Sequence, residues 1–230
     1  MQAARWSISA LILALVAGCA GGTDELNTQT SRFISTGELL RNTLFTPEPE
    51  LPDVTRALLD GLTVPSLEAK VEERDGLAYL IPFHTKTVPG LGKINTWTTG
   101  DGSQLVLRSG VIVATRGLGD DMTSSDKRGT IAFVTGRGGG NWPLRLDIQT
   151  AADGVIRQDF VCTGTRGGIQ SIEIVELTYR VESLSENCTS ANGQRITNRY
   201  WVDTRDGTVW QTRQWAGAKI GYIDTRILKK

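Results

Sequence analysis

A succession of short alternating segments, separated by glycine turns, fills most of the chain after Pro65 and restricts it to a sheet-based fold. The segments are rich in valine, isoleucine, threonine and aromatic residues, which suit strands. The turns carry pairs that favour tight reversals between antiparallel strands: Asp75-Gly76, Asp101-Gly102, Asp153-Gly154, Asn192-Gly193 and Asp206-Gly207. The sequence therefore predicts a meander of antiparallel hairpins and a mainly β fold.

The clearest strand covers residues 175–182, where Val175, Leu177, Tyr179 and Val181 alternate with polar residues. Such alternation gives a strand one buried and one solvent-facing side. We expect its neighbours to be the segments around 155–162 and 199–204. Residues 122–141 interrupt the pattern with several glycines and predict a loop or a weak helix between two groups of strands.

Helix is favoured only ahead of the strands. Thr36 precedes Glu38, Leu39 and Leu40, but the prolines at 47, 49 and 52 exclude one continuous helix. Asp53 can cap a helix over 54–62, whose apolar residues fall on one face: Val54, Leu58, Leu59 and Leu62. We expect one or two short N-terminal helices.

The first 18 residues have the profile of an export signal. Arg5 is a single positive charge, residues 8–16 are apolar or small, and small residues precede Cys19. The apolar run is well short of the roughly 20 residues that cross a bilayer as a helix. We therefore expect residues 1–18 to be removed as a signal peptide.

Residues 15–19 resemble the lipobox of bacterial lipoproteins, in which the cysteine thiol carries a diacylglyceryl group. We expect cleavage before Cys19 and lipid attachment to its sulfur, with an ordinary secretory signal and an incidental cysteine as the alternative. Ala20 is not the aspartate that marks inner-membrane retention, which favours the outer membrane with the body in the periplasm. Residues 19–31 predict a flexible tether, and 32–230 a single domain.

Net charge and cysteine content bear on two further properties, nucleic-acid binding and disulfide formation. The formal net charge is +0, so nothing in the sequence favours binding to nucleic acid. Once Cys19 is lipidated, two cysteines are left, and an oxidising periplasm would join Cys162 to Cys188. A bridge closing about 26 residues is worth roughly 3–4 kcal/mol in the chain-entropy model. We expect this disulfide to be structural.

Motifs for common chemistry are missing from the sequence. There is no zinc-binding pattern, the single histidine is His84, and the glycines at 136–140 lack a phosphate-loop ending. We expect no metal and no cofactor. Three carboxylates, Asp120, Asp121 and Asp126, are candidates for acid-base chemistry, because they follow the tight backbone predicted for Gly117-Leu118-Gly119; the alternative is a turn whose aspartates bond backbone amides.

Tryptophans are the remaining candidates for binding. Trp201, Trp210 and Trp215 lie on neighbouring expected strands, where flat rings can stack on sugars, although burial is the commoner fate of tryptophan. Strand alternation places Tyr200 and Trp201 on opposite faces, and it separates Trp210 from Trp215 in the same way.

Five pieces of the sequence, in their order and spacing, carry a family resemblance: 111–121, 160–162, Cys188, 197–202 and 210–215. They resemble the YjbF/GfcB family of lipoproteins linked to capsule and exopolysaccharide production, over about residues 64–224. The resemblance implies a large meandering β-sheet curled on itself, like a sandwich or a partial barrel, with some likeness to periplasmic lipid carriers. It implies no catalytic residues, because the family offers no established reaction.

Three functions follow as expectations. The first is a non-enzymatic accessory factor in exopolysaccharide or capsule secretion or assembly, held on the periplasmic side of the outer membrane by its lipidated N-terminus. Its partners would be export or assembly proteins, or the polysaccharide. The second is a carrier module that binds a lipid or a glycan, and the third is a polysaccharide-modifying enzyme that uses Asp120 and Asp121.

Overall fold

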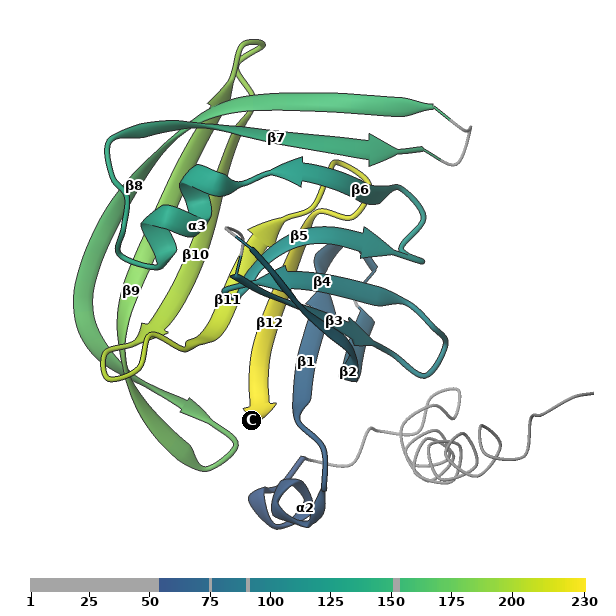
Figure 1. Ribbon diagram of the computed structural model, residues 1–230, viewed down its shortest axis with the longest axis vertical. Coiled ribbons are helices and arrows are strands. Elements are labelled where there is room, and N and C mark those ends of the chain that lie inside the picture. The colour runs from purple at the N-terminus through teal and green to yellow at the C-terminus, as the bar shows by residue number, and fades with distance from the viewer. Residues whose placement is uncertain (1–53, 75, 90–91, 151–153) are drawn as a thin grey trace, which may run out of the picture.

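The computed structural model describes residues 54–74, 76–89, 92–150 and 154–230. The expected signal peptide, the tether, Cys19 and Asp53 lie outside these residues. The described chain forms an antiparallel sheet of twelve strands with few helical turns (Figure 1). The prediction of a mainly β, curled meander is confirmed. Within the described part, no helix has the length and apolar character of a membrane span.

The strands follow one another along the chain with few interruptions. They are β1 (Ser66–Val71), β2 (Gly76–Val88), β3 (Gly92–Thr98), β4 (Gln104–Arg108), β5 (Val111–Arg116), β6 (Asp121–Asp126), β7 (Asn141–Gln149), β8 (Val155–Ile174), β9 (Leu177–Ser190), β10 (Arg195–Asp203), β11 (Val209–Trp215) and β12 (Tyr222–Lys229). The helical elements are α2 (Arg56–Gly61), η1 (Glu72–Arg74) and α3 (Arg128–Val134).

The order of the strands requires the sheet to curl. It runs β5-β4-β3-β2-β1-β12-β11-β10-β9-β8-β7-β6, so β5 and β6 are the two edges although only residues 117–120 separate them in sequence. That link spans at most about 18 Å, whereas twelve strands laid flat would separate the edges by roughly 50 Å. The sheet therefore bends round until its edges meet, as Figure 1 shows.

Side chains, rather than a backbone ladder, join these two edges. Ser125 Oγ on β6 donates to the carbonyl of Val113 on β5 at 2.8 Å. Thr115 Oγ1 on β5 accepts from the amide of Met122 on β6 at 2.9 Å. Such bonds satisfy edge groups that would otherwise be free to pair with another chain. We call this contact of β5 with β6 the seam.

The concave side of the sheet encloses the main hydrophobic core. α3 lies inside the curl beside β7 (Figure 1), and it buries Ile131, Phe133 and Val134 there. This segment corrects the sequence-based expectation in part, because residues 122–141 contain both strand β6 and helix α3 rather than only a loop or weak helix. A helix of seven residues is marginal alone, so packing against the core stabilises it.

A second apolar cluster forms where α2 meets the sheet. It contains Leu59, Ile174, Val181, Trp210 and Leu228. The guanidinium of Arg56 fastens α2 by donating to the carbonyls of Ile174, Val175 and Leu228 at 3.0–3.3 Å. Thr55 caps this helix, with its Oγ1 accepting from the amide of Leu58. Leu58 is 45% exposed, so only part of the expected apolar face is buried.

The hairpin pattern of the sequence agrees with the described strands. β9 pairs with β8 on one side and β10 on the other, as expected. Val175 and Glu176 are the exception within the expected strand, since both have positive φ in the turn between β8 and β9. The pairs Asp101-Gly102, Asn192-Gly193 and Asp206-Gly207 all lie between consecutive strands.

Candidate functional site

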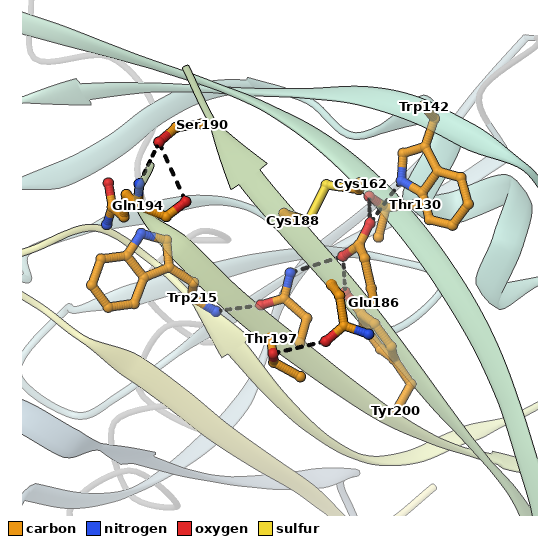
Figure 2. Close-up of a disulfide and its surroundings, with 12 residues drawn as sticks. Thr130, Trp142, Cys162, Glu186, Cys188, Ser190, Gln194, Thr197, Tyr200 and Trp215 are labelled. Carbon is orange, nitrogen blue, oxygen red and sulfur yellow. Dashed lines mark hydrogen bonds between the residues drawn. A yellow bond between two sulfur atoms is a disulfide. The ribbon is translucent and has the colours of Figure 1, made fainter. Parts of the chain in front are cut away.

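A fully buried carboxylate, that of Glu186 on β9, is the centre of the polar groups inside the curl (Figure 2). Its Oε1 accepts from Trp142 Nε1 at 2.8 Å and from the hydroxyl of Thr130. Its Oε2 accepts from Asn198 Nδ2 at 2.8 Å and from the hydroxyl of Tyr200 at 3.4 Å. Each oxygen thus has two donors, which is about what a carboxylate can accept.

Lys127 brings a second charge to this region. It is 3% exposed and stands at the N-terminal end of α3. Burial lowers the pKa of the Lys127 ammonium to about 8, and the charge of Glu186 offsets only part of that effect. Burial also raises the pKa of the Tyr200 phenol, and the charge of Glu186 reinforces this rise. The interior therefore holds an anion with a buried cation as its counter-charge.

The disulfide lies beside this carboxylate. Cys162 on β8 and Cys188 on β9 are direct partners across the two strands, and their sulfurs are bonded. The expected pairing is confirmed. Cys188 follows Glu186 by two residues and so points to the same side of β9. The bridge and the four hydrogen bonds together fix β7, β8, β9, β10 and α3 around one point, as seen in Figure 2.

The loop between β5 and β6 is a turn held by one aspartate. The carboxylate of Asp121 accepts from the amides of Gly117 at 2.7 Å and Leu118 at 3.0 Å, and from Thr115 Oγ1 at 2.9 Å. Gly117 and Gly119 have φ values of 81° and 91°, a region that favours glycine. These bonds match the structural alternative for Asp121. Asp120 is half-buried in the same loop.

Asp126, the third carboxylate candidate, is bound to a cation. Its two oxygens accept from Arg128 Nε and Nη2 at 2.9 and 2.7 Å. This arginine lowers the pKa of the Asp126 carboxyl. Because Asp126 lies at the far end of β6 from Asp121, the three aspartates do not converge on one point.

The expected stacking residues pack against different apolar clusters. Trp210 is buried in the second cluster, with its ring 3.8 Å from that of Tyr179 and its Nε1 donating to Asp203 at 2.8 Å. Trp201 is half-buried against the same cluster. Trp215 is half-buried against the main core, edge-on to Tyr222 at 5.3 Å. The expected separation of Tyr200 from Trp201 holds, since Tyr200 lies in the main core.

Among the described residues, two depressions that open to solvent are of a size to hold a ligand. A polar groove of about 490 Å³ runs along the seam, where Arg116, Gly119 and Asp121 contribute to its wall. An apolar recess of about 260 Å³ enters the curl among β1, β3, β4, β11 and β12, and its wall includes Leu67, Trp97 and Leu107. Neither is lined by Glu186 or Lys127. The buried charges are therefore not placed to act on a ligand in either depression.

Sequence reasoning missed the buried polar centre. Glu186 lies on β9 in phase with Leu184 and Cys188, both of which are buried. A charged residue at a core position of an alternating strand was the signal that could have revealed it. Lys127 and Thr130 gave no such signal, because the helix that carries them follows from tertiary packing.

Comparison with one solved structure supports the fold. The crystal structure of the hypothetical lipoprotein YmcC from Escherichia coli K12 has a TM-score of 0.69 and 15% identity, covering 86% of this chain and 94% of that one. A Bacteroides fragilis protein with a YmcC-like fold gives a TM-score of only 0.33 at 10% identity, covering 72% and 93% of the two chains. No curated protein sequence matches significantly.

The family model described as group 4 capsule polysaccharide lipoprotein gfcB, YjbF matches residues 37–228. This match extends from before α2 to Leu228 in β12, and so it includes the seam, the buried centre and both depressions. The chain belongs to the YjbF/GfcB family of capsule polysaccharide lipoproteins.

Proposed function

We propose that this protein is an accessory factor for the secretion or assembly of exopolysaccharide or capsule, and that it catalyses no reaction itself. Cys19 would anchor it in the outer membrane by lipid, with the body on the periplasmic side. The observation that carries the proposal is the family match over residues 37–228, whose family is associated with capsule polysaccharide. Its partners would be export or assembly proteins, or the polymer.

The engagement of the carboxylates supports a role without catalysis. A general acid or base must reach a substrate proton within hydrogen-bonding distance. Asp121 already accepts two hydrogen bonds from its own loop and one from Thr115 on β5, and Glu186 accepts four away from solvent. Carboxylates occupied in this way hold the fold together.

The proposal is tested by deletion and complementation. A strain lacking the gene should lose most of its surface polysaccharide, and the wild-type gene should restore it. A gene carrying Asp120→Asn should restore it equally, since Asn preserves size and hydrogen-bonding capacity while removing the charge. If Asp120→Asn abolished polysaccharide at normal protein level, the carboxylate-dependent enzyme would be the better account.

A second candidate function is a carrier for lipid or glycan. The observation that favours it is the recess inside the curl, which has exposed residues at its mouth and buried apolar residues at its floor. Concave, mostly apolar sites with a few polar groups are the usual form of small-molecule sites. Ligand extracted with the purified protein would distinguish this candidate from the first.

A further inference from the structure

We propose that the apolar recess holds a single aliphatic chain whose anionic head group, a carboxylate or a phosphate, lies beside Arg137. The inference deepens the second candidate function, and its failure would leave the accessory role untouched. Nothing in the family match assigns a ligand to this recess.

The shape of the recess suits a narrow chain. Its rim includes exposed residues from three separate turns, Ser109, Thr135 and Gly207, whereas Leu67 at its floor is 1% exposed. A volume of about 260 Å³ lies just below the range of roughly 300–1,000 Å³ found for sites that enclose drug-sized ligands. Such a funnel accepts one chain end-on more readily than a sugar ring.

Several polar side chains of the wall already have hydrogen-bond partners within the protein. Thr212 Oγ1 and Thr225 Oγ1 bond each other at 2.7 Å, and Gln214 Nε2 donates to Thr212 Oγ1 at 3.0 Å. Asn95 Oδ1 accepts from Thr85 Oγ1 at 3.0 Å. None of the residues that line the recess is charged. The wall therefore offers an occupant few hydrogen bonds. This favours a hydrocarbon chain over a glycan, whose hydroxyl groups would lose their bonds to water.

A positive charge at the mouth of the recess favours a ligand with an anionic head group. Arg137 is exposed, and its Nε donates to Thr135 Oγ1 on the rim at 3.1 Å. Among the described residues its side chain makes no ion pair. On the other side of the rim, Lys230 bonds Thr208 but is paired with Asp206 at 3.0 Å. Arg137 is thus a cation at the rim that an anionic head can reach, and arginine binds both carboxylate and phosphate well.

The test uses the full exported chain carrying Cys19→Ala, so that no acyl group of its own is attached. Binding of fatty acids from eight to fourteen carbons is measured by calorimetry below their micelle concentrations. Affinity should rise roughly fourfold for each added methylene until the recess is filled. Quenching of Trp97 fluorescence by a brominated fatty acid, lost in Trp97→Phe, would place the chain in the recess.

Two variants on β3 separate the recess from non-specific binding. Asn95 lines the recess, and Asn95→Phe should fill it and lower affinity by at least about tenfold. Thr96 follows it and points to the other face of the strand, so Thr96→Phe should bind like the wild type. Equal binding by Asn95→Phe and the wild type, or no dependence on chain length, would overturn the proposal.

Binding experiments with ligands that differ only in their head group identify the source of the anion. Arg137→Gln should weaken binding of a fatty acid but leave binding of the matched alcohol unchanged. A preference for lysophosphatidylglycerol over the fatty acid would indicate a membrane phospholipid, and the reverse preference a free fatty acid. If alcohol and acid bound equally in the wild type, or if a neutral oligosaccharide displaced the acid, the assignment would be wrong.

Discussion

The buried carboxylate of Glu186 on β9 accepts a 2.8 Å hydrogen bond from the indole of Trp142 on β7, two strands away in the sheet. The same carboxylate binds Thr130 on α3 and Asn198 on β10. One charged group on β9 thus joins the helix inside the curl to β7 and β10, which lie on either side of β9 in the sheet. Buried charges are costly unless they are fully bonded, so this centre should fix the position of α3.

Removal of this carboxylate should be among the most damaging single changes. Glu186→Ala leaves several buried donors unpaired and Lys127 without its counter-charge, so we expect a loss of about 3–5 kcal/mol in the free energy of unfolding. Glu186→Gln keeps one acceptor oxygen and should lose about 1–3 kcal/mol. Urea denaturation measures both values.

Glu182 provides the matched control on the same strand. It pairs with Arg166, whose side chain is 44% exposed, and exposed pairs contribute less than about 1 kcal/mol. Glu182→Ala should therefore be mild. If Glu182→Ala and Glu186→Ala lowered the free energy of unfolding by similar amounts, the buried centre would contribute no more to stability than an exposed ion pair.

The lowered pKa of Lys127 predicts an unusual dependence of stability on pH. Its pKa falls from 10.5 to about 8 on folding, so between these values the unfolded chain binds more protons than the folded one. The Lys127 contribution to stability should therefore rise with pH from about 8 to 10.5, by up to about 3 kcal/mol. The difference between wild type and Lys127→Met, measured by urea denaturation across this range, isolates it. A flat difference would show that Lys127 titrates normally in the fold.

The stability of the seam between β5 and β6 should depend on Asp121. Asp121→Ala removes the acceptor for two amides and for Thr115, at a cost of about 1–3 kcal/mol. Hydrogen exchange should accelerate mainly in β5 and β6, because their edges share no backbone ladder. Asp159→Ala, which removes an exposed pair with Arg145, is the control. Uniform acceleration across the sheet would argue against a local role.

Much of the fold could be predicted because its signals are local. Alternation located the strands, glycine pairs located the turns, and two cysteines left after lipidation predicted the bridge between Cys162 and Cys188. For the segment that forms α3, the sequence left a loop and a weak helix as alternatives, since the stability of this helix comes from burying Phe133 and its neighbours against the core. Glu186 was missed because acidic residues usually lie at the surface.

The tryptophans show a further limit of strand periodicity. β10 and β11 slip in register, so Trp201 faces Gln211 whereas Val202 faces Val209, and Trp210 has no partner opposite it. Such a bulge redirects side chains and cannot be read from alternation alone. The face of β11 on which Trp210 lies therefore could not be predicted from alternation alone.

Replacement of Cys19 should separate anchoring from folding. Cys19→Ala removes the thiol that would carry the lipid, whereas the described body begins at Val54 and has its own cores. We expect soluble, folded protein in the periplasmic fraction, checked by fractionation and by an intact Cys162–Cys188 bridge. Membrane association that persists after salt washing would contradict lipid attachment at Cys19.

The most direct test of the accessory role is the distribution of polysaccharide in a deletion strain, measured at the cell surface and inside the envelope. The account predicts that surface polymer falls while the sugar composition and linkages of the remaining polymer stay unchanged, because the protein assists export or assembly without altering the polymer. Normal surface polymer in the deletion strain would contradict the role, and a chemically altered polymer would contradict the claim that no reaction is catalysed.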